Sequence, residues 1–248
     1  MRVLTILLVA GCVVAAGVAR GEGEGEPTWT YAGATGPDHW AELDPEWEAC
    51  GAGRRQSPID VGGAAAGDLK PLTFRYRDSL ASVTDTGHTV LFSPNASNVL
   101  RIGRRAVGTL AQVHFHAGSE HRVAGRTFPL ELHLVHHDAD EHLTVVGVLV
   151  RRGAPNKAAT EMLGEMPADH DAPTVFGSID PAGLLPDRLR SVRYAGSLTT
   201  PPCTEGVRWV VLTRPITMSP AQIAAFREHY AENQRPLQAL NGRSLLAG

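Results

Sequence analysis

The chain has 248 residues, of which 43% are hydrophobic and 20% are charged, as expected for a globular protein just under the size at which single domains split. Its 23 Lys and Arg and 26 Asp and Glu residues give a formal net charge of -3. Because these charges are interspersed and form no basic stripe, the composition argues against a nucleic-acid partner.

The N-terminus predicts export. Arg2 precedes an apolar run over residues 3–19 that closes on small residues, as in a secretory signal peptide cleaved near Ala19. The run is shorter than a bilayer span and is followed by glutamates, so we expect no membrane span after the signal is removed. Residues 20–28, rich in Gly and Glu, are expected to form a flexible leader. We predict a periplasmic or secreted protein, although residues 9–12 also resemble a lipoprotein box that would anchor the chain through Cys12.

Two cysteines remain after such a cleavage. Cys50 and Cys203 form an even pair in an oxidising compartment, for which a disulfide is the natural interpretation. The alternative is a pair of unpaired, buried thiols.

Short strands dominate the predicted elements. Apolar and polar residues alternate over 109–117 and 129–136, whereas 145–150 and 207–212 are almost continuous apolar runs, typical of strands buried on both faces. One short helix is expected over 157–163, and another begins at Ser219, which forms a capping-box pattern with Gln222. The pattern predicts a mostly β protein with a single domain over 29–248. We expect a large, twisted, mostly antiparallel central sheet and a few short surface helices.

Histidines occur on one face of two of these strands. The two-residue period of a strand places Gln112, His114 and His116 on a common face, and likewise Glu131 and His133. If the strands are neighbours, three imidazoles converge. Three neutral imidazoles leave a tetrahedral zinc ion one open position for water, as in catalytic zinc sites. Gln112 and Glu131 are then expected to accept hydrogen bonds from the ring nitrogens that do not bind the metal.

The order of motifs resembles that of the alpha-class carbonic anhydrases over residues 29–243. The matching segments are Gln56-Ser-Pro-Ile-Asp60, Gly87-His88, Gln112-Val-His-Phe-His116, Gly118-Ser-Glu-His121, Glu131-Leu-His-Leu-Val-His136, Gly196-Ser-Leu-Thr-Thr-Pro-Pro202 and Arg235-Pro236. This resemblance implies a zinc enzyme that reversibly hydrates carbon dioxide to bicarbonate and a proton by means of a zinc-bound hydroxide. It also matches Cys50 and Cys203 to the disulfide that is common in secreted members.

The resemblance implies roles for individual residues. Glu120 and Thr199 would together orient the zinc-bound hydroxide, and His88 would shuttle protons to solvent. The zinc ligands would be His114, His116 and His133. The substrate-binding residues would form a largely apolar wall of Val135, Val145, Leu198, Thr200, Val207 and Trp209.

Three positions depart from the family pattern. Thr86 and Leu91 stand where many relatives carry amides that order the proton-carrying waters, so we expect slower proton transfer. Ala117 stands where many relatives carry tryptophan, which is expected to loosen the ligand strand or to lower zinc affinity.

Two alternative interpretations remain at this stage. Gly108, His114, His116 and Glu120 fit the first motif of the cupins, in which Glu120 would be a metal ligand, although no second cupin motif follows. A non-catalytic zinc-binding module on the same fold is the other alternative. The substrate is expected to be small, and the protein to be a monomer or a homodimer.

Overall fold

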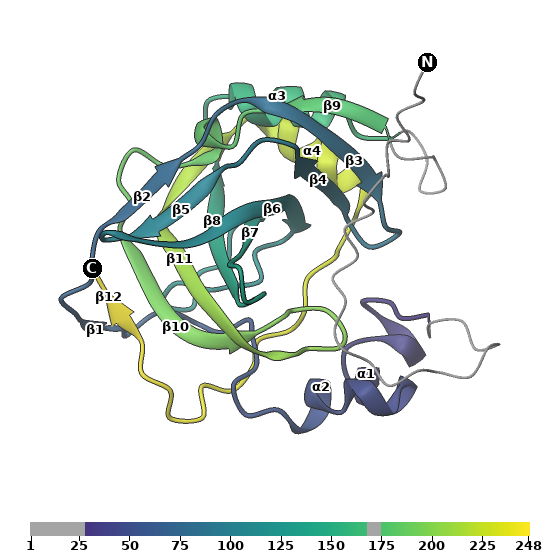
Figure 1. The fold of residues 1–248 in the computed structure, drawn as a ribbon. Coiled ribbons are helices and arrows are strands. Elements are labelled where there is room, and N and C mark those ends of the chain that lie inside the picture. The colour runs from purple at the N-terminus through teal and green to yellow at the C-terminus, as the bar shows by residue number, and fades with distance from the viewer. Residues whose placement is uncertain (1–27, 168–174) are drawn as a thin grey trace, which may run out of the picture.

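The computed structural model describes residues 28–167 and 175–248. In these residues twelve strands form one sheet, in the order β1-β12-β10-β11-β8-β7-β6-β4-β3-β9, with β2 joined through β5 to β6 (Figure 1). The strands are β1 (Ala65–Ala66), β2 (Leu72–Arg75), β3 (Ser79–Asp85), β4 (Val90–Pro94), β5 (Val99–Ile102), β6 (Arg105–Ala117), β7 (Leu130–His137), β8 (Leu143–Arg152), β9 (Val175–Ile179), β10 (Ser191–Ser197), β11 (Glu205–Met218) and β12 (Leu246–Ala247). The expected signal peptide and residues 20–27 of the expected leader lie outside the described residues.

Most neighbouring strands of the sheet run antiparallel, as predicted. The pairs β8–β11 and β1–β12 are the parallel exceptions among the described strands. The two apolar runs of the sequence lie within β8 and β11, where Val145 is paired with Trp209. Residues 144–150 of β8 are all buried, because the strand is covered on both faces.

Helices in the described chain are short and lie at the periphery. They are α1 (Trp40–Leu43), α2 (Ala49–Ala52), α3 (Lys157–Gly164) and α4 (Pro220–His229), with 3-10 turns η1 (Gly33–Thr35), η2 (Pro45–Trp47) and η3 (Ala182–Leu184). The two predicted helices correspond to α3 and α4, and the capping box of Ser219 with Gln222 is present. In Figure 1, α3 and α4 lie near β3 and β9, whereas α1 and α2 lie at the opposite end of the molecule.

Two apolar cores cover the two faces of the central strands. The larger core takes Val113 and Phe115 of β6, alternate leucines of β7, and Phe226 of α4. The smaller core, on the other face, contains Val145 and Trp209. The alternate residues of β6 and β7, including all the expected metal ligands, therefore point away from the larger core.

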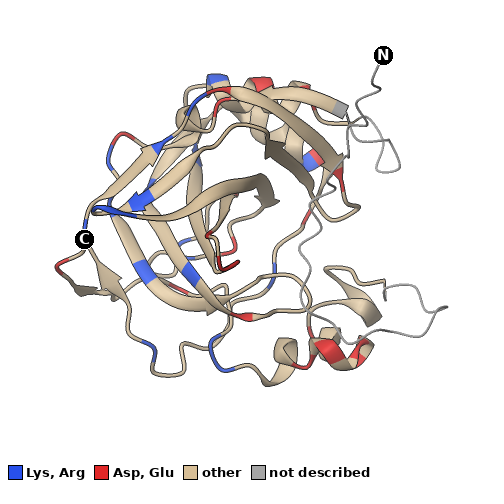
Figure 2. Ribbon diagram, in the orientation of Figure 1, with Lys and Arg blue, Asp and Glu red and all other residues tan. Residues whose placement is uncertain are grey.

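Charged residues are distributed over both ends and the rim of the fold. Figure 2 shows red and blue segments mostly on loops, helices and strand ends, while the central strands are largely tan. Four carboxylates among the described residues are exceptions, because Asp44, Asp85, Glu120 and Glu131 are all buried, the last two with only 2% and 0% exposed. Buried carboxylates are stable only when hydrogen bonds or cations satisfy them, which marks their surroundings as functional candidates.

The predicted disulfide is confirmed. Cys50 of α2 and Cys203, in the loop before β11, are bonded with an S–S distance of 2.08 Å. This bond attaches the N-terminal helices to the loop that follows β10. Within residues 28–167 and 175–248, no helix is long and apolar enough to cross a lipid bilayer.

Candidate metal centre and active site

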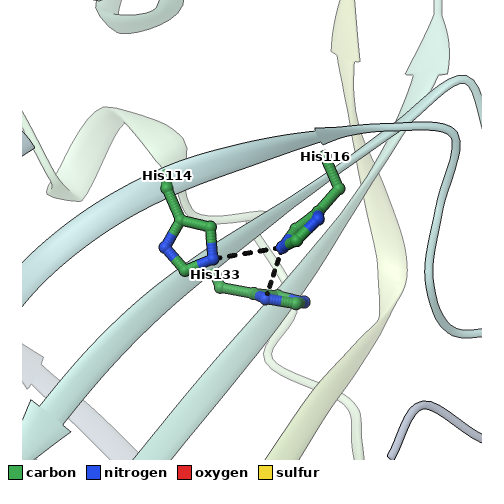
Figure 3. A group of neighbouring side chains, drawn as sticks. All are labelled: His114, His116 and His133. Carbon is green, nitrogen blue, oxygen red and sulfur yellow. Dashed lines mark hydrogen bonds between the residues drawn. The ribbon is translucent and has the colours of Figure 1, made fainter. Parts of the chain in front are cut away.

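Three imidazoles meet on the face of β6 and β7 that the sequence predicted (Figure 3). His114 and His133 are directly opposite each other in the antiparallel register, and His116 lies two residues further along β6. His116 Nε2 is 3.1 Å from His114 Nε2 and 3.1 Å from His133 Nδ1. Since these nitrogens come from three rings on two strands, their convergence is a product of strand pairing.

The second nitrogen of each ring, which points away from the other two rings and is called the outer nitrogen below, donates a hydrogen bond to an oxygen. His114 Nδ1 donates to Gln112 Oε1 at 2.7 Å, and His133 Nε2 donates to Glu131 Oε1 at 3.0 Å. His116 Nδ1 donates to the backbone carbonyl of Asn233 at 2.6 Å. Gln112 and Glu131 therefore lie where the sequence placed them. The carbonyl of Asn233 was missed, because any residue can supply a carbonyl oxygen.

These hydrogen bonds of the outer nitrogens determine the protonation of the inner nitrogens, which are the three that converge. A neutral imidazole carries one proton, and in each ring that proton is needed at the outer nitrogen. The three inner nitrogens therefore face one another with lone pairs, an arrangement that a cation stabilises. Nitrogens at 2.0–2.1 Å from a tetrahedral zinc would be about 3.4 Å apart. The chemistry and spacing of the donor set thus fit zinc.

The pKa values of two of the candidate ligands agree with neutral rings. Burial, followed by the neighbouring rings of His116 and His133, holds the pKa of His114 well below its usual value. Burial likewise lowers the pKa of His116, against the opposing charge of Glu120. Neutral imidazoles are the form that binds a metal.

Glu131 connects the metal centre to a buried chain of polar groups. Its Oε1 also accepts from His121 Nδ1 at 2.7 Å, and His121 Nε2 lies 2.6 Å from the hydroxyl of Tyr194. Burial alone would raise the pKa of the Glu131 carboxyl, but His121 and His133 hold it well below its usual value. Glu131 thus remains an anionic acceptor that fixes the ring of His133.

Glu120 lies behind the imidazoles. Its Oε1 accepts the backbone N–H of Arg235 at 2.8 Å. Its Oε2 is 3.6 Å from His116 Nε2 and 3.8 Å from His133 Nε2, and it has no hydrogen-bond partner among the described residues. The carboxylate therefore presents one unsatisfied oxygen beside the metal centre.

Comparison with known proteins decides the family. A model of the eukaryotic-type carbonic anhydrases matches residues 35–247. The chain belongs to the carbonic anhydrase family. It is 39% identical over 221 residues to the carbonic anhydrase of Pectobacterium carotovorum, which covers 88% of this chain and 90% of that protein. With the carbonic anhydrase of Neisseria gonorrhoeae it shares 37% identity over 245 residues, or 98% and 96% of the two chains.

The fold of this carbonic anhydrase agrees with its sequence relatives. The alpha-carbonic anhydrase of Thermovibrio ammonificans, solved with the inhibitor sulfanilamide, superposes with a TM-score of 0.85 at 38% identity. The match covers 90% of this chain and 100% of that one. The chain is therefore an enzyme for the reversible hydration of carbon dioxide, and the cupin interpretation is wrong.

The expected apolar wall of the carbonic anhydrase lies beside His133. Val145, Val207 and Trp209 are buried in the smaller core, and Val135 and Leu198 pack against it partly exposed. The Trp209 ring is 4.8 Å from the ring of His133, centroid to centroid.

Thr199 and Thr200 begin the turn that follows the wall residue Leu198. Thr199 is 6% exposed, and Thr200 is partly exposed with its carbonyl accepting the N–H of Cys203 at 2.9 Å. Within the described chain, no hydrogen bond joins the Thr199 hydroxyl to Glu120.

His88 lies on the turn between β3 and β4. Its ring stacks on Trp29 with centroids 3.6 Å apart, and its Nε2 is 2.9 Å from the Trp29 carbonyl oxygen. The side chain is partly exposed, as a group that exchanges protons with solvent must be.

The departures from the family pattern have structural counterparts in this carbonic anhydrase. Thr86 closes the His88 turn, because its hydroxyl donates to the Thr89 carbonyl at 2.9 Å. Ala117 is fully buried in the larger core, and its N–H donates to Asn233 Oδ1 at 2.6 Å. The backbone of β6 is thus attached at this point to the segment that follows α4. Leu91 is partly buried, and nothing in the structure assigns it a role.

Proposed function

We propose that this carbonic anhydrase works with zinc bound by His114, His116 and His133. The observation that supports this is the convergence of three nitrogen lone pairs whose partner nitrogens all donate to oxygen acceptors. Zinc bound there would supply a hydroxide nucleophile near neutral pH, because zinc lowers the pKa of a bound water, to about 7 in the carbonic anhydrases themselves.

Glu120 and Thr199 would orient the attacking oxygen. The Oε2 of Glu120 is a buried acceptor without a partner among the described residues, and the Thr199 hydroxyl would donate its proton to it. With its proton so committed, the Thr199 oxygen can only accept a hydrogen bond from the nucleophile. That bond directs a lone pair of the nucleophile at the substrate.

The apolar wall would hold carbon dioxide next to that nucleophile. Carbon dioxide carries no charge, so an apolar surface formed by Val145, Val207 and Trp209 favours it over water. Thr200, which is partly exposed beside Thr199, would contact the more polar bicarbonate product.

His88 would return the site to its reactive form. Each turnover leaves one proton at the metal centre, and an imidazole whose ordinary pKa is about 6.5 exchanges protons with buffer at neutral pH. Its partial exposure and its fixed position on Trp29 support this role.

Export would bring the enzyme to a compartment that favours its disulfide. The Cys50–Cys203 bond agrees with a periplasmic or secreted location, whether the expected signal is cleaved near Ala19 or the chain is lipid-anchored through Cys12. The oligomeric state, monomer or homodimer, stays a prediction.

A ligand substitution tests the zinc proposal. His114→Asn should lose bound zinc and reduce carbon dioxide hydration by at least about a hundredfold, because two imidazoles do not make a stable site. Metal analysis and stopped-flow hydration assays measure the two effects. His142→Asn is the matched control, since His142 lies on an exposed turn. Stoichiometric zinc in His114→Asn would contradict the ligand assignment. Stoichiometric zinc with no hydration activity in the unaltered protein would instead favour the non-catalytic module.

A further inference from the structure

A buried carboxylate holds the base of the His88 turn. Asp85 ends β3, and its side chain is 0% exposed. Its Oδ1 accepts the N–H of Gly87 at 2.8 Å and its Oδ2 accepts from His229 Nε2 at 2.6 Å, while the Tyr230 hydroxyl donates to Oδ1. A buried carboxylate needs such donors to offset its desolvation. The bonds therefore tie the start of the turn to the end of α4.

The turn itself is tight, and its own hydrogen bonds, which include the Thr86 N–H donating to the Thr89 carbonyl at 3.0 Å, are local. Gly87 has φ +77, in the left-handed region that favours glycine. Thr86 accepts the N–H of Thr89 at 3.1 Å and that of His88 at 3.3 Å, bonds that stay within the turn. An exposed hairpin turn held only by such local bonds moves readily relative to the sheet. The His88 ring is held directly by its stack on Trp29 and by the contact of its Nε2 with the Trp29 carbonyl, and the backbone that carries the ring is held by further bonds that leave the turn.

Two further bonds tie the turn to the ligand strand. Asn233 Nδ2 donates to the carbonyl of His88 at 3.0 Å and to that of Phe115 at 3.1 Å. Thr89 Oγ1 donates to the same Phe115 carbonyl at 2.8 Å. Phe115 lies between His114 and His116 on β6, so the backbone of the turn is joined to the strand of the metal centre.

We propose that Asp85 is a positioning residue for His88, and that it acts through the hydrogen bonds it receives from Gly87, His229 and Tyr230. Without the carboxylate, the first half of the turn is released while the bonds of Asn233 and Thr89 remain. The His88 imidazole then samples several positions instead of one, and fewer of these suit proton transfer. This inference rests on the proposed role of His88 as the proton shuttle.

The state of Tyr230 agrees with this arrangement. Burial, and then the hydrogen bond and negative charge of Asp85, raise the pKa of Tyr230 well above its usual value. The phenol therefore remains a donor throughout the working range of the enzyme. Its ring also packs against Phe226 and His229, with centroids 6.0 Å and 5.1 Å away, so Tyr230→Phe removes the donor and keeps the packing.

Steady-state kinetics of the zinc-loaded enzyme separate positioning from a general structural effect. The value of kcat/KM covers the steps up to bicarbonate release, whereas proton export follows and affects kcat in weak buffer. Asp85→Asn and Tyr230→Phe should lower kcat in weak buffer by about three- to tenfold, as expected for a misplaced proton carrier, with kcat/KM and zinc content unchanged. Added imidazole should restore kcat. Asp138→Asn is the matched control, because Asp138 accepts the N–H of Asp140 in another hairpin turn.

His88→Ala provides the reference that distinguishes the two proposals. If Asp85 acts through His88, the double variant Asp85→Asn/His88→Ala should be no slower than His88→Ala alone. Normal kcat in weak buffer for Asp85→Asn and Tyr230→Phe, with a slow His88→Ala, would overturn the positioning role and leave the shuttle intact. A fall in kcat/KM as large as the fall in kcat, or a loss of bound zinc, in both variants would also overturn it. A fully active His88→Ala would remove the shuttle, and this inference with it.

Discussion

The direction of single hydrogen bonds decides which imidazoles of this protein can bind a cation. In His114 the outer nitrogen donates to an amide oxygen, which leaves the inner lone pair free. His136, three residues after the candidate ligand His133, differs in this respect. Its Nδ1 donates to the Thr144 carbonyl at 3.1 Å and its Nε2 accepts from the Tyr76 hydroxyl. Both nitrogens of His136 are hydrogen-bonded to protein groups, so His136 has a structural role in the core.

His136 should make the protein less stable in acid. Burial lowers its pKa from 6.5 to about 4. Between these values the unfolded chain binds a proton that the folded chain does not, so the stabilisation is present above pH 6.5 and is lost as the pH falls towards 4. At 1.4 kcal/mol per pKa unit, the loss in unfolding free energy amounts to about 3 kcal/mol.

Urea unfolding of the protein and of His136→Gln checks this expectation. The difference in unfolding free energy between the two should shrink as the pH is lowered from about 7 to about 4.5, because only the unaltered protein contains this buried imidazole. His136 is not one of the candidate ligands, so loss of the proposed zinc in acid would contribute to both proteins. A difference that is constant over this range would show that His136 does not contribute.

At the scale of elements, one hairpin supplies the core of the candidate metal centre. β6 and β7 carry all three candidate ligands and two of their outer acceptors, Gln112 and Glu131. A slip of one residue in this register would turn the ligands of one strand to the other face. Leucines of β7, packed in the larger core, hold the register because they would be exposed by the same slip.

Gln222 joins two helices by their N-termini. Its Oε1 accepts the N–H of Ser219 at 2.9 Å and that of Asn156 at 3.0 Å. Its Nε2 donates to the Asn156 carbonyl at 2.6 Å. Asn156 is the N-cap of α3, so one side chain serves the first turn of α4 and the cap of α3 together.

Substitutions of Ser219 and of Gln222 should therefore lower the free energy of unfolding by different amounts. Ser219→Ala removes only the cap of α4 and should cost about 1 kcal/mol. Gln222→Ala leaves several backbone groups of both helices unsatisfied and should cost about 2–3 kcal/mol. Chemical denaturation measures both, and equal costs would contradict a link between the helices.

On the scale of the whole molecule, segments far apart in the chain enclose the candidate metal centre. The segment after α4 supplies the Asn233 carbonyl to His116 and the Arg235 N–H to Glu120. The guanidinium of Arg235 in turn donates to the carbonyl of Cys50 at 2.9 Å. The disulfide continues this connection from Cys50 to the loop that begins at Thr199.

Loss of the disulfide should lower the stability of the whole domain. The bond joins residues separated by 153 positions, and the double variant Cys50→Ser/Cys203→Ser should be about 2–5 kcal/mol less stable. Thermal unfolding with and without a reductant measures the effect. Reductant should lower the Tm of the unaltered protein and leave that of the variant unchanged. An equal response of both proteins would contradict the assignment.

The sequence alone was enough for the strand faces, the two helices and the outer hydrogen-bond partners of two candidate ligands, His114 and His133. These features follow from periods of two and 3.6 residues and from local capping patterns, which are written in neighbouring residues. The resemblance to a known family added Glu120, Thr199 and His88, whose residue types would otherwise indicate an ordinary turn or surface position.

Only the tertiary structure decided which distant groups meet. The Asn233 carbonyl on His116, the Arg235 N–H on Glu120 and the His229 and Tyr230 donors on Asp85 have no local signature. A backbone carbonyl or N–H is present in almost every residue, and its partner depends on how segments more than a hundred positions apart pack together. The choice of the three candidate ligands was thus determined by the sequence of one hairpin, and their orientation and surroundings by the packing of the whole chain.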